Sequence, residues 1–271
     1  MEKKSSSLLT LQKVIDSLIA PDGCSWDREQ TPASLCDYVL EEAHELVAAI
    51  RHGSDADVCE ELGDVLFLLV FISTLYAGKG SFTIEQAIEV NAAKMIRRHP
   101  HVFANTVFET REEQLSEWER IKRSEKKDED GMPGGIFDSL PQNLPPLLKA
   151  YRIHSKAARA EFTWDSDQDV EQQVEAEWLE LIDTLASDNK AAQERELGDL
   201  IFTLVELGRR KGIKASAALD FACHRFLGRF AFMESSARGQ GKDFTALSMD
   251  EKNTLWDTAK VQEKKHGEAS S

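Results

Sequence analysis

Residues 41–75 read EEAHELVAAIRHGSDADVCEELGDVLFLLVFISTL. Apolar residues recur there at spacings of three and four, the period of α-helices with one buried face. Glu42 and Glu45 lie one helical turn apart, and so do Glu61 and Asp64 further along the chain. Residues three apart share a helix face, so each pair projects together. The stretch therefore predicts two neighbouring helices that carry four carboxylates.

The same helical period continues through most of the chain. Proline and glycine are sparse within long stretches rich in Ala, Leu, Glu, Lys and Arg, and no strand-like alternation lasts long enough to build a sheet. We predict an all-α fold, with helices near 8–19, 32–52, 55–78, 84–98, 111–127, 141–160, 167–187, 190–211, 214–235 and 248–265. The Thr31-Pro32 pair predicts a helix start, because Thr can cap a helix and Pro suits its first turn.

An internal repeat organises the chain. The acidic quartet returns as Glu177, Glu180, Glu196 and Asp199, and in both halves the first and third acids are 19 residues apart. Further pairs recur in the same order: Lys94 and Arg98 match Arg225 and Arg229, Trp118 and Lys122 match Trp256 and Lys260, and Trp26-Asp27 matches Trp164-Asp165. Matched elements in a fixed order indicate a duplication.

A linker separates the two copies. Residues 126–146, KKDEDGMPGGIFDSLPQNLPP, combine a charge run with glycines and four of the seven prolines of the chain. We therefore expect a first helical domain at 1–125 and a second at 147–271, two tandem helical bundle modules of similar design.

The acids lie within apolar stripes that we expect to face the bundle interior, Glu42 beside Val39 and Leu46, and Asp64 beside Leu68. Burying an ionised carboxylate costs several kcal/mol unless it is compensated, and several together raise each other's pKa unless a dication holds them. Oxygen ligands alone favour Mg²⁺, with Mn²⁺ as a substitute. Mg²⁺ is usually shared with substrate phosphates, so the pattern points to a polyphosphate. One E-x-x-E pair is usually a solvated helix face, but the repetition favours the metal site.

Basic and aromatic residues are candidates for substrate contacts. We expect Lys94 with Arg98, and Arg225 with Arg229, to hold a triphosphate, because each pair lies one turn apart. Trp118 and Trp256 can stack on a base while Lys122 and Lys260 reach a phosphate. The alternatives are a core or interface anchor for each Trp and a solvated surface for each basic pair.

These residues resemble the MazG family of nucleoside triphosphate pyrophosphohydrolases. The similarity rests on Cys24–Asp27 (CSWD), Glu29–Thr31 (EQT), Glu41–Glu45 (EEAHE), Glu61–Asp64 (ELGD) and Arg97–Phe103 (RRHPHVF). It implies an all-α fold, Mg²⁺ dependence, a homodimer, and hydrolysis of nucleoside triphosphates to a nucleoside monophosphate and pyrophosphate. It further implies that the metal ligands are Glu42, Glu45, Glu61 and Asp64 in one half and Glu177, Glu180, Glu196 and Asp199 in the other.

The chain departs from the family pattern at a few positions. Ala176 stands where the first half has Glu41, Arg225 replaces Lys94, and Ser25 replaces the proline usual in the first motif. If Glu41 helps to orient the attacking water, the second site is slower; if Glu41 lies outside the ligand set, little changes. We expect Glu41, Glu42 and Glu177 to include the carboxylates that assist proton removal from water.

Bulk properties exclude other classes. A net charge of −15 argues against nucleic-acid binding, which needs clustered cations. The N-terminus has no signal-peptide pattern, and the longest apolar run, 65–77, is too short to cross a bilayer. The four cysteines form no C-x-x-C pair, as expected for reduced thiols. We expect a cytoplasmic protein without membrane or nucleic-acid partners.

Rival functions fit the sequence less well. A di-iron bundle needs Glu-x-x-His on two helices, and Glu41-x-x-His44 has no counterpart in the repeat. A P-loop fails because Asp243 follows Gly241-Lys242 where Ser or Thr is required. A non-catalytic module that binds nucleotides or a partner protein remains the alternative to the enzyme.

Overall fold

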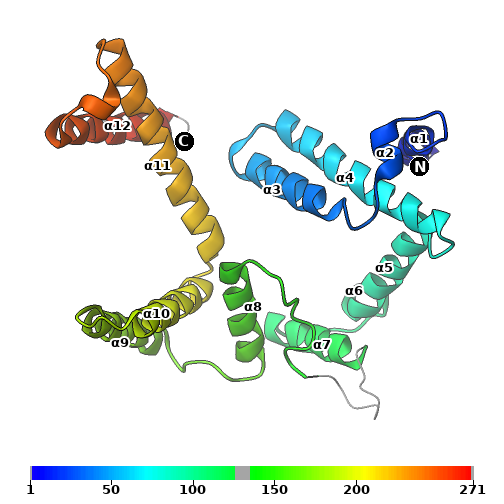
Figure 1. Ribbon diagram of the computed structural model, residues 1–271. Helices are drawn as coiled ribbons and strands as arrows, with labels where there is room; N and C mark the ends of the chain where they lie inside the picture. The colour runs from blue at the N-terminus through cyan, green and yellow to red at the C-terminus, as the bar shows by residue number, and fades with distance from the viewer. Residues whose placement is uncertain (1, 126–134, 270–271) are drawn as a thin grey trace. The chain divides into compact units, whose positions relative to one another are not determined.

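The computed structural model describes residues 2–125 and 135–269, and Figure 1 draws them as a succession of helices. Within these residues every regular element is a helix and no strand occurs, which confirms the all-α prediction. The chain divides into two compact units, Met1–Trp118 and Glu119–Ser271. The first nine residues of the predicted linker, 126–134, lie outside the described residues.

The first unit is centred on a helical hairpin. It contains α1 (Glu2–Leu18), α2 (Ser25–Glu29), α3 (Cys36–His52), α4 (Asp55–Gly78), α5 (Ile84–Arg98), α6 (Pro100–Phe103) and the start of α7 (Arg111–Ser124). Helices α3 and α4 lie side by side, and α1 packs against α4 (Figure 1). The fully buried core joins Ile15 of α1 to Val70 and Phe71 of α4.

The second unit repeats this hairpin. It contains the end of α7, then α8 (Pro146–Arg159), α9 (Asp167–Leu185), α10 (Lys190–Arg210), α11 (Ala215–Gly239), the 3-10 helix η1 (Phe244–Ala246) and α12 (Met249–Ala269). Helices α9 and α10 form the hairpin, α8 packs against α10, and α11 pairs with α12. The order α8–α9–α10 therefore reproduces the packing of α1, α3 and α4.

Helix caps fix where the second helix of each hairpin begins. The Ser54 hydroxyl accepts a hydrogen bond from the Asp57 amide, and the Asp57 carboxylate accepts one from the Ser54 amide, a capping box. In the second unit Asn189 Oδ1 accepts a bond from the Ala192 amide at 3.2 Å. Each cap lies seven residues before the first quartet acid of its helix, Glu61 or Glu196. The caps therefore place both acids at the same height on their helices.

All the predicted helices are present, but their details differ. The helix predicted to begin at Thr31-Pro32 begins instead at Cys36, so that prediction was wrong. The Ser34 amide donates to Thr31 Oγ1 at 3.1 Å and the Thr31 amide donates to Ser34 Oγ at 2.9 Å, which closes a turn in front of the helix. The short helices α2, α6 and η1 were not predicted, because elements of three to five residues carry no helical period.

A polar network is buried in the second unit where the first has an aromatic ring. Glu206 occupies the repeat position of Phe71, and both are fully buried. Arg209 donates to the Glu206 carboxylate at 2.6 and 2.9 Å, and Thr163 Oγ1 donates at 3.2 Å. Burial opposes ionisation of Glu206, but these hydrogen bonds outweigh it and lower its pKa. The carboxylate therefore stays charged inside the unit.

His154 joins this network and makes it sensitive to acid. Its Nε2 lies 3.0 Å from the Phe202 carbonyl oxygen, and its Nδ1 lies 3.6 Å from Glu206. Desolvation lowers the pKa of His154 below its ordinary 6.5. The folded state therefore binds this proton less readily than the unfolded state, and the contribution of His154 to stability falls as the pH drops below 6.5.

Replacing Glu206 with Ala is expected to destabilise the second unit by about 3 kcal/mol, because Arg209 and Thr163 lose their buried partner. Urea unfolding followed by circular dichroism measures the change. Glu171→Ala is the matched control: its carboxylate is exposed and lies 3.7 Å from Lys211, so it should change stability little. Equal losses in the two variants would contradict a structural role for the network.

Candidate metal and nucleotide site

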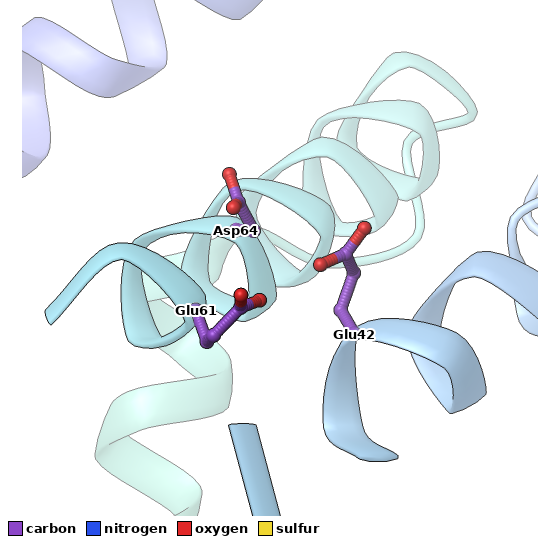
Figure 2. Close-up of side chains that lie close together, drawn as sticks. All are labelled: Glu42, Glu61 and Asp64. Atoms are coloured by element: carbon purple, nitrogen blue, oxygen red, sulfur yellow. The ribbon is translucent and has the colours of Figure 1, made fainter. Parts of the chain in front are cut away.

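Three carboxylates converge on the first hairpin. Glu42 projects from α3, and Glu61 and Asp64 project from one face of α4 (Figure 2). Each offers an oxygen that lies within 4.8 Å of the oxygens of the other two. Glu61 and Asp64 share a face because they are three residues apart, and the hairpin brings Glu42 opposite them. This is the spacing that one cation needs to touch all three residues.

The second hairpin carries the same arrangement. Glu177 of α9 and Glu196 and Asp199 of α10 also offer oxygens within 4.8 Å of one another. We name the two sets the first and second acid clusters. Glu45 and Glu180, which the sequence groups with them, are exposed and lie outside these sets. Glu45 is nevertheless close enough for its charge to act on both Glu42 and Glu61.

The acids lie at the rim of the hairpin, so the prediction that they face the bundle interior was wrong. Glu42 and Glu61 are half-buried and Asp64 is exposed. The buried core of the first unit begins further along α4, at Leu68. The apolar stripe was recognised correctly, but the sequence could not show that other helices cover only its C-terminal part.

Electrostatic strain remains in the first acid cluster. Desolvation raises the pKa of Glu42, and repulsion by Glu45 and Asp64 raises it further. Desolvation and repulsion by Glu45 likewise raise the pKa of Glu61. Oxygen donors at this spacing, partly shielded from water, match the preference of Mg²⁺ or Mn²⁺. The residues therefore fit a hard divalent cation, which would relieve the repulsion.

In both halves an arginine side chain lies over a tryptophan ring. The Arg98 guanidinium carbon lies 5.7 Å from the centroid of the Trp118 ring, and that of Arg229 lies 5.2 Å from Trp256. Arg229 also donates to Glu263 at 2.7 Å. Each pair joins two helices, which the sequence did not predict, because it grouped each arginine with a basic neighbour on its own helix.

The remaining predicted substrate residues have varied surroundings. Lys94 is half-buried on α5, while Arg225 lines an open cavity of about 520 Å³ beside Arg229 and Ala259. Lys260 pairs with Asp257 at 2.7 Å. Lys122 lies 3.3 Å from Glu119, and the boundary between the units falls between Trp118 and Lys122, which the sequence grouped together.

Two neighbours of the second acid cluster were missed from the sequence. Gln173 Nε2 donates to Glu177 at 2.9 Å, and Arg195 Nε donates to Glu196 at 3.2 Å. Gln173 lies one turn before Glu177, so helical spacing could have revealed it. Arg195 directly precedes Glu196, and its position corresponds to Glu60 in the first half. Only this comparison draws attention to the residue.

The protein is therefore an all-α protein with two similar helical hairpins, and each hairpin carries a carboxylate cluster that could hold a metal ion. The family model of the MazG nucleotide pyrophosphohydrolase domain matches residues 30–103, which include the first acid cluster. The second acid cluster lies outside the matched residues.

Relatives match over nearly the whole chain. The chain is 36% identical over 250 residues to the nucleoside triphosphate pyrophosphohydrolase/pyrophosphatase MazG of Thermotoga maritima, covering 92% of this chain and 94% of that protein. It is 34% identical over 244 residues to the nucleoside triphosphate pyrophosphohydrolase of Escherichia coli K12, covering 89% and 92%. The chain therefore belongs to the MazG family of nucleoside triphosphate pyrophosphohydrolases.

Glu42→Gln is expected to raise the melting temperature of the metal-free protein by about 1–3 °C, because it removes one of the repelling charges. The same change should reduce the stabilisation that added Mg²⁺ gives, since the cluster loses one of its three carboxylates. Differential scanning fluorimetry with and without Mg²⁺ measures both. Asp37→Asn, on the same helix but outside the cluster, is the control. An unchanged Mg²⁺ response in Glu42→Gln would contradict the assignment.

Proposed function

We propose that this chain hydrolyses nucleoside triphosphates between the α and β phosphates, releasing a nucleoside monophosphate and pyrophosphate, with Mg²⁺ as cofactor and Mn²⁺ as a substitute. The observation that supports it most is the facing carboxylates of Glu42, Glu61 and Asp64. The relatives that match most of the chain bear the name of this activity.

The residues divide the work between binding and proton transfer. The acid clusters would hold the cation, with Glu45 and Glu180 as the fourth acid of each quartet. Mg²⁺ supplies positive charge and Lewis acidity toward the triphosphate. Arg98 and Arg229, each seated on a tryptophan ring, neutralise phosphate oxygens. Lys94, Lys122, Arg225 and Lys260 add positive charge, and the outer faces of Trp118 and Trp256 receive the base.

Water is the nucleophile, so no side chain forms a covalent intermediate. Glu41 adjoins Glu42 and is exposed, which leaves it free to accept a proton from the attacking water. Glu42 and Glu177 are the inner carboxylates of the two halves and orient that water. The nucleotide specificity lies in the contacts around the base rather than in these acids.

Phosphorus NMR of the purified protein with each nucleoside triphosphate and Mg²⁺ tests the reaction. The expected products are the monophosphate and pyrophosphate, formed only with a divalent cation, because the carboxylates repel the triphosphate without one. Chelation with EDTA is the control. A diphosphate with orthophosphate, or no turnover above background, would sink the proposal and favour the non-catalytic binding module.

We further propose a homodimer built on the outer faces of the hairpins. Leu62, Leu66 and Leu69 of α4 are each more than 40% exposed and follow one helix face. The repeat positions in α10, Leu197, Ile201 and Leu204, are exposed to the same degree. Aligned apolar stripes of this kind are typical of interfaces. A second copy of the chain offers the matching stripes.

Sedimentation analysis checks the dimer. The wild-type chain should sediment at twice its chain mass, and Leu66→Glu combined with Ile201→Glu should shift it to the monomer, because each glutamate places a charge in an apolar contact. Glu89→Lys, an exposed change on α5, should leave the mass unaltered. A monomeric wild-type protein would contradict the proposal.

A cytoplasmic location is also proposed. All four cysteines are free thiols and all are exposed, which suits a reducing compartment. None of the described helices has the length and apolarity that crossing a bilayer requires.

A further inference from the structure

Helix α8 is strongly basic, although the chain as a whole has a net charge of −15. It contains no Asp or Glu, and its four cations are Lys149, Arg152, Lys156 and Arg159. Successive cations are three or four residues apart, so all four lie along one face of the helix. The protein therefore concentrates positive charge on this one helix face.

Packing against a hairpin does not require these cations. Helix α1 packs on α4 in the first unit as α8 packs on α10 in the second. In the alignment that pairs Trp164 with Trp26, three of the cations fall on apolar residues of α1: Lys149 on Leu11, Arg152 on Val14 and Lys156 on Leu18. A helix without these charges thus packs in the same place, so another constraint accounts for the cations of α8.

Two cations of α8 and one of α7 surround a single carboxylate. Glu119 of α7 accepts hydrogen bonds from Arg159 Nη1 at 2.6 Å, from Lys122 Nζ at 3.3 Å and from Lys156 Nζ at 3.4 Å. We name these four residues the basic cluster, and all four belong to the second unit. Three cations against one carboxylate leave the cluster with an excess of positive charge.

The basic cluster is partly shielded from water. The Lys156 side chain is only 5% exposed, and those of Glu119 and Lys122 are each 15% exposed. Desolvation lowers the pKa of Lys122, and repulsion by Lys156 and Arg152 adds to this effect, while Glu119 opposes it. Excess charge of one sign in a poorly solvated place is unfavourable unless a counter-ion is bound.

The basic cluster keeps hydrogen-bond donors for such a counter-ion. Lys156 has three N–H groups, of which one is bonded to Glu119 and another to the Ile136 carbonyl oxygen at 3.0 Å. Within residues 2–125 and 135–269, Lys122 and Arg159 are hydrogen-bonded to Glu119 alone. Lysine and arginine groups that converge in this way are the donors that phosphate oxygens bind.

We propose that the basic cluster is a binding site for a phosphate oxyanion that needs no divalent cation. It shares no residue with either acid cluster and does not rest on the proposed hydrolysis. Lys122, which the sequence grouped with Trp118, thereby joins Lys156 and Arg159 of α8. Glu119 holds the three cations together, and the bound anion neutralises their excess charge. The phosphate group belongs either to a free inorganic anion or to a nucleotide.

Calorimetric titration with inorganic pyrophosphate in metal-free buffer tests the site, because acid clusters without a cation repel the anion. The wild-type chain should bind pyrophosphate, and added NaCl should weaken the binding. Arg159→Gln should weaken it by about tenfold, since a charge-assisted contact is lost. Lys149→Gln is the matched control on the same helix, because Lys149 Nζ is bonded to the Gln142 carbonyl oxygen outside the cluster, and it should change affinity by less than about twofold.

Glu119→Gln separates an anion site from an ion-pair network that only holds α7 on α8. The amide keeps the shape of the side chain and removes its negative charge, so pyrophosphate should bind about fivefold more tightly. Pyrophosphate should also raise the melting temperature of this variant more than that of the wild type. A purely structural network predicts a less stable variant with no gain in affinity. Circular dichroism confirms that each variant is folded.

Separate titrations with inorganic phosphate, pyrophosphate and a nucleoside triphosphate, all in metal-free buffer, distinguish the two sources of the anion. Equal affinity for pyrophosphate and the triphosphate assigns the site to the inorganic anion, and tighter binding of the triphosphate assigns it to a nucleotide. Three results would overturn the proposal: no phosphate compound binds the wild type, Arg159→Gln binds as tightly as the wild type, or Glu119→Gln gains no affinity.

Discussion

Repulsion between carboxylates on two packed helices is the constraint around which each half of this protein is built. The hairpin of α3 and α4 holds Glu42 against Glu61 and Asp64, and the hairpin of α9 and α10 repeats the contact. Such an arrangement is unfavourable by itself and becomes favourable when a dication is shared. The acids are tolerated because they lie at the rim, while the apolar core beyond them holds the helices together.

Other features of each hairpin keep the acids of its two helices facing one another. The cap at Ser54 and the cap at Asn189 start α4 and α10 at the same distance before Glu61 and Glu196. The cores differ more freely, since Phe71 in one half corresponds to the hydrogen-bonded Glu206 in the other. Both halves keep the same three acids, although their buried cores differ. This is expected if the acids are constrained by function.

Much of this could be predicted from the sequence, because helical period and the interval between acids are local properties. They gave the long helices, the duplication and the residues of both clusters. The start of α3 was misplaced because Thr31 and Ser34 close a turn that resembles a cap. The contacts of Arg98 with Trp118 and of Arg229 with Trp256 join separate helices, so no spacing along the chain could reveal them. The rim position of the acids depended on how far α1 covers α4, which is likewise a tertiary property.

The two halves show how a duplicated site can keep its ligands and change its setting. Arg195 and Ala176 leave the inner acids of the second cluster in place but alter the charge around them. The proposed hydrolysis requires above all that the first acid cluster bind a divalent cation. Anomalous diffraction from crystals grown with Mn²⁺ tests it directly. We expect a peak between Glu42, Glu61 and Asp64. Mn²⁺ bound only elsewhere on the first hairpin, or not bound at all, would contradict a cation site at this cluster.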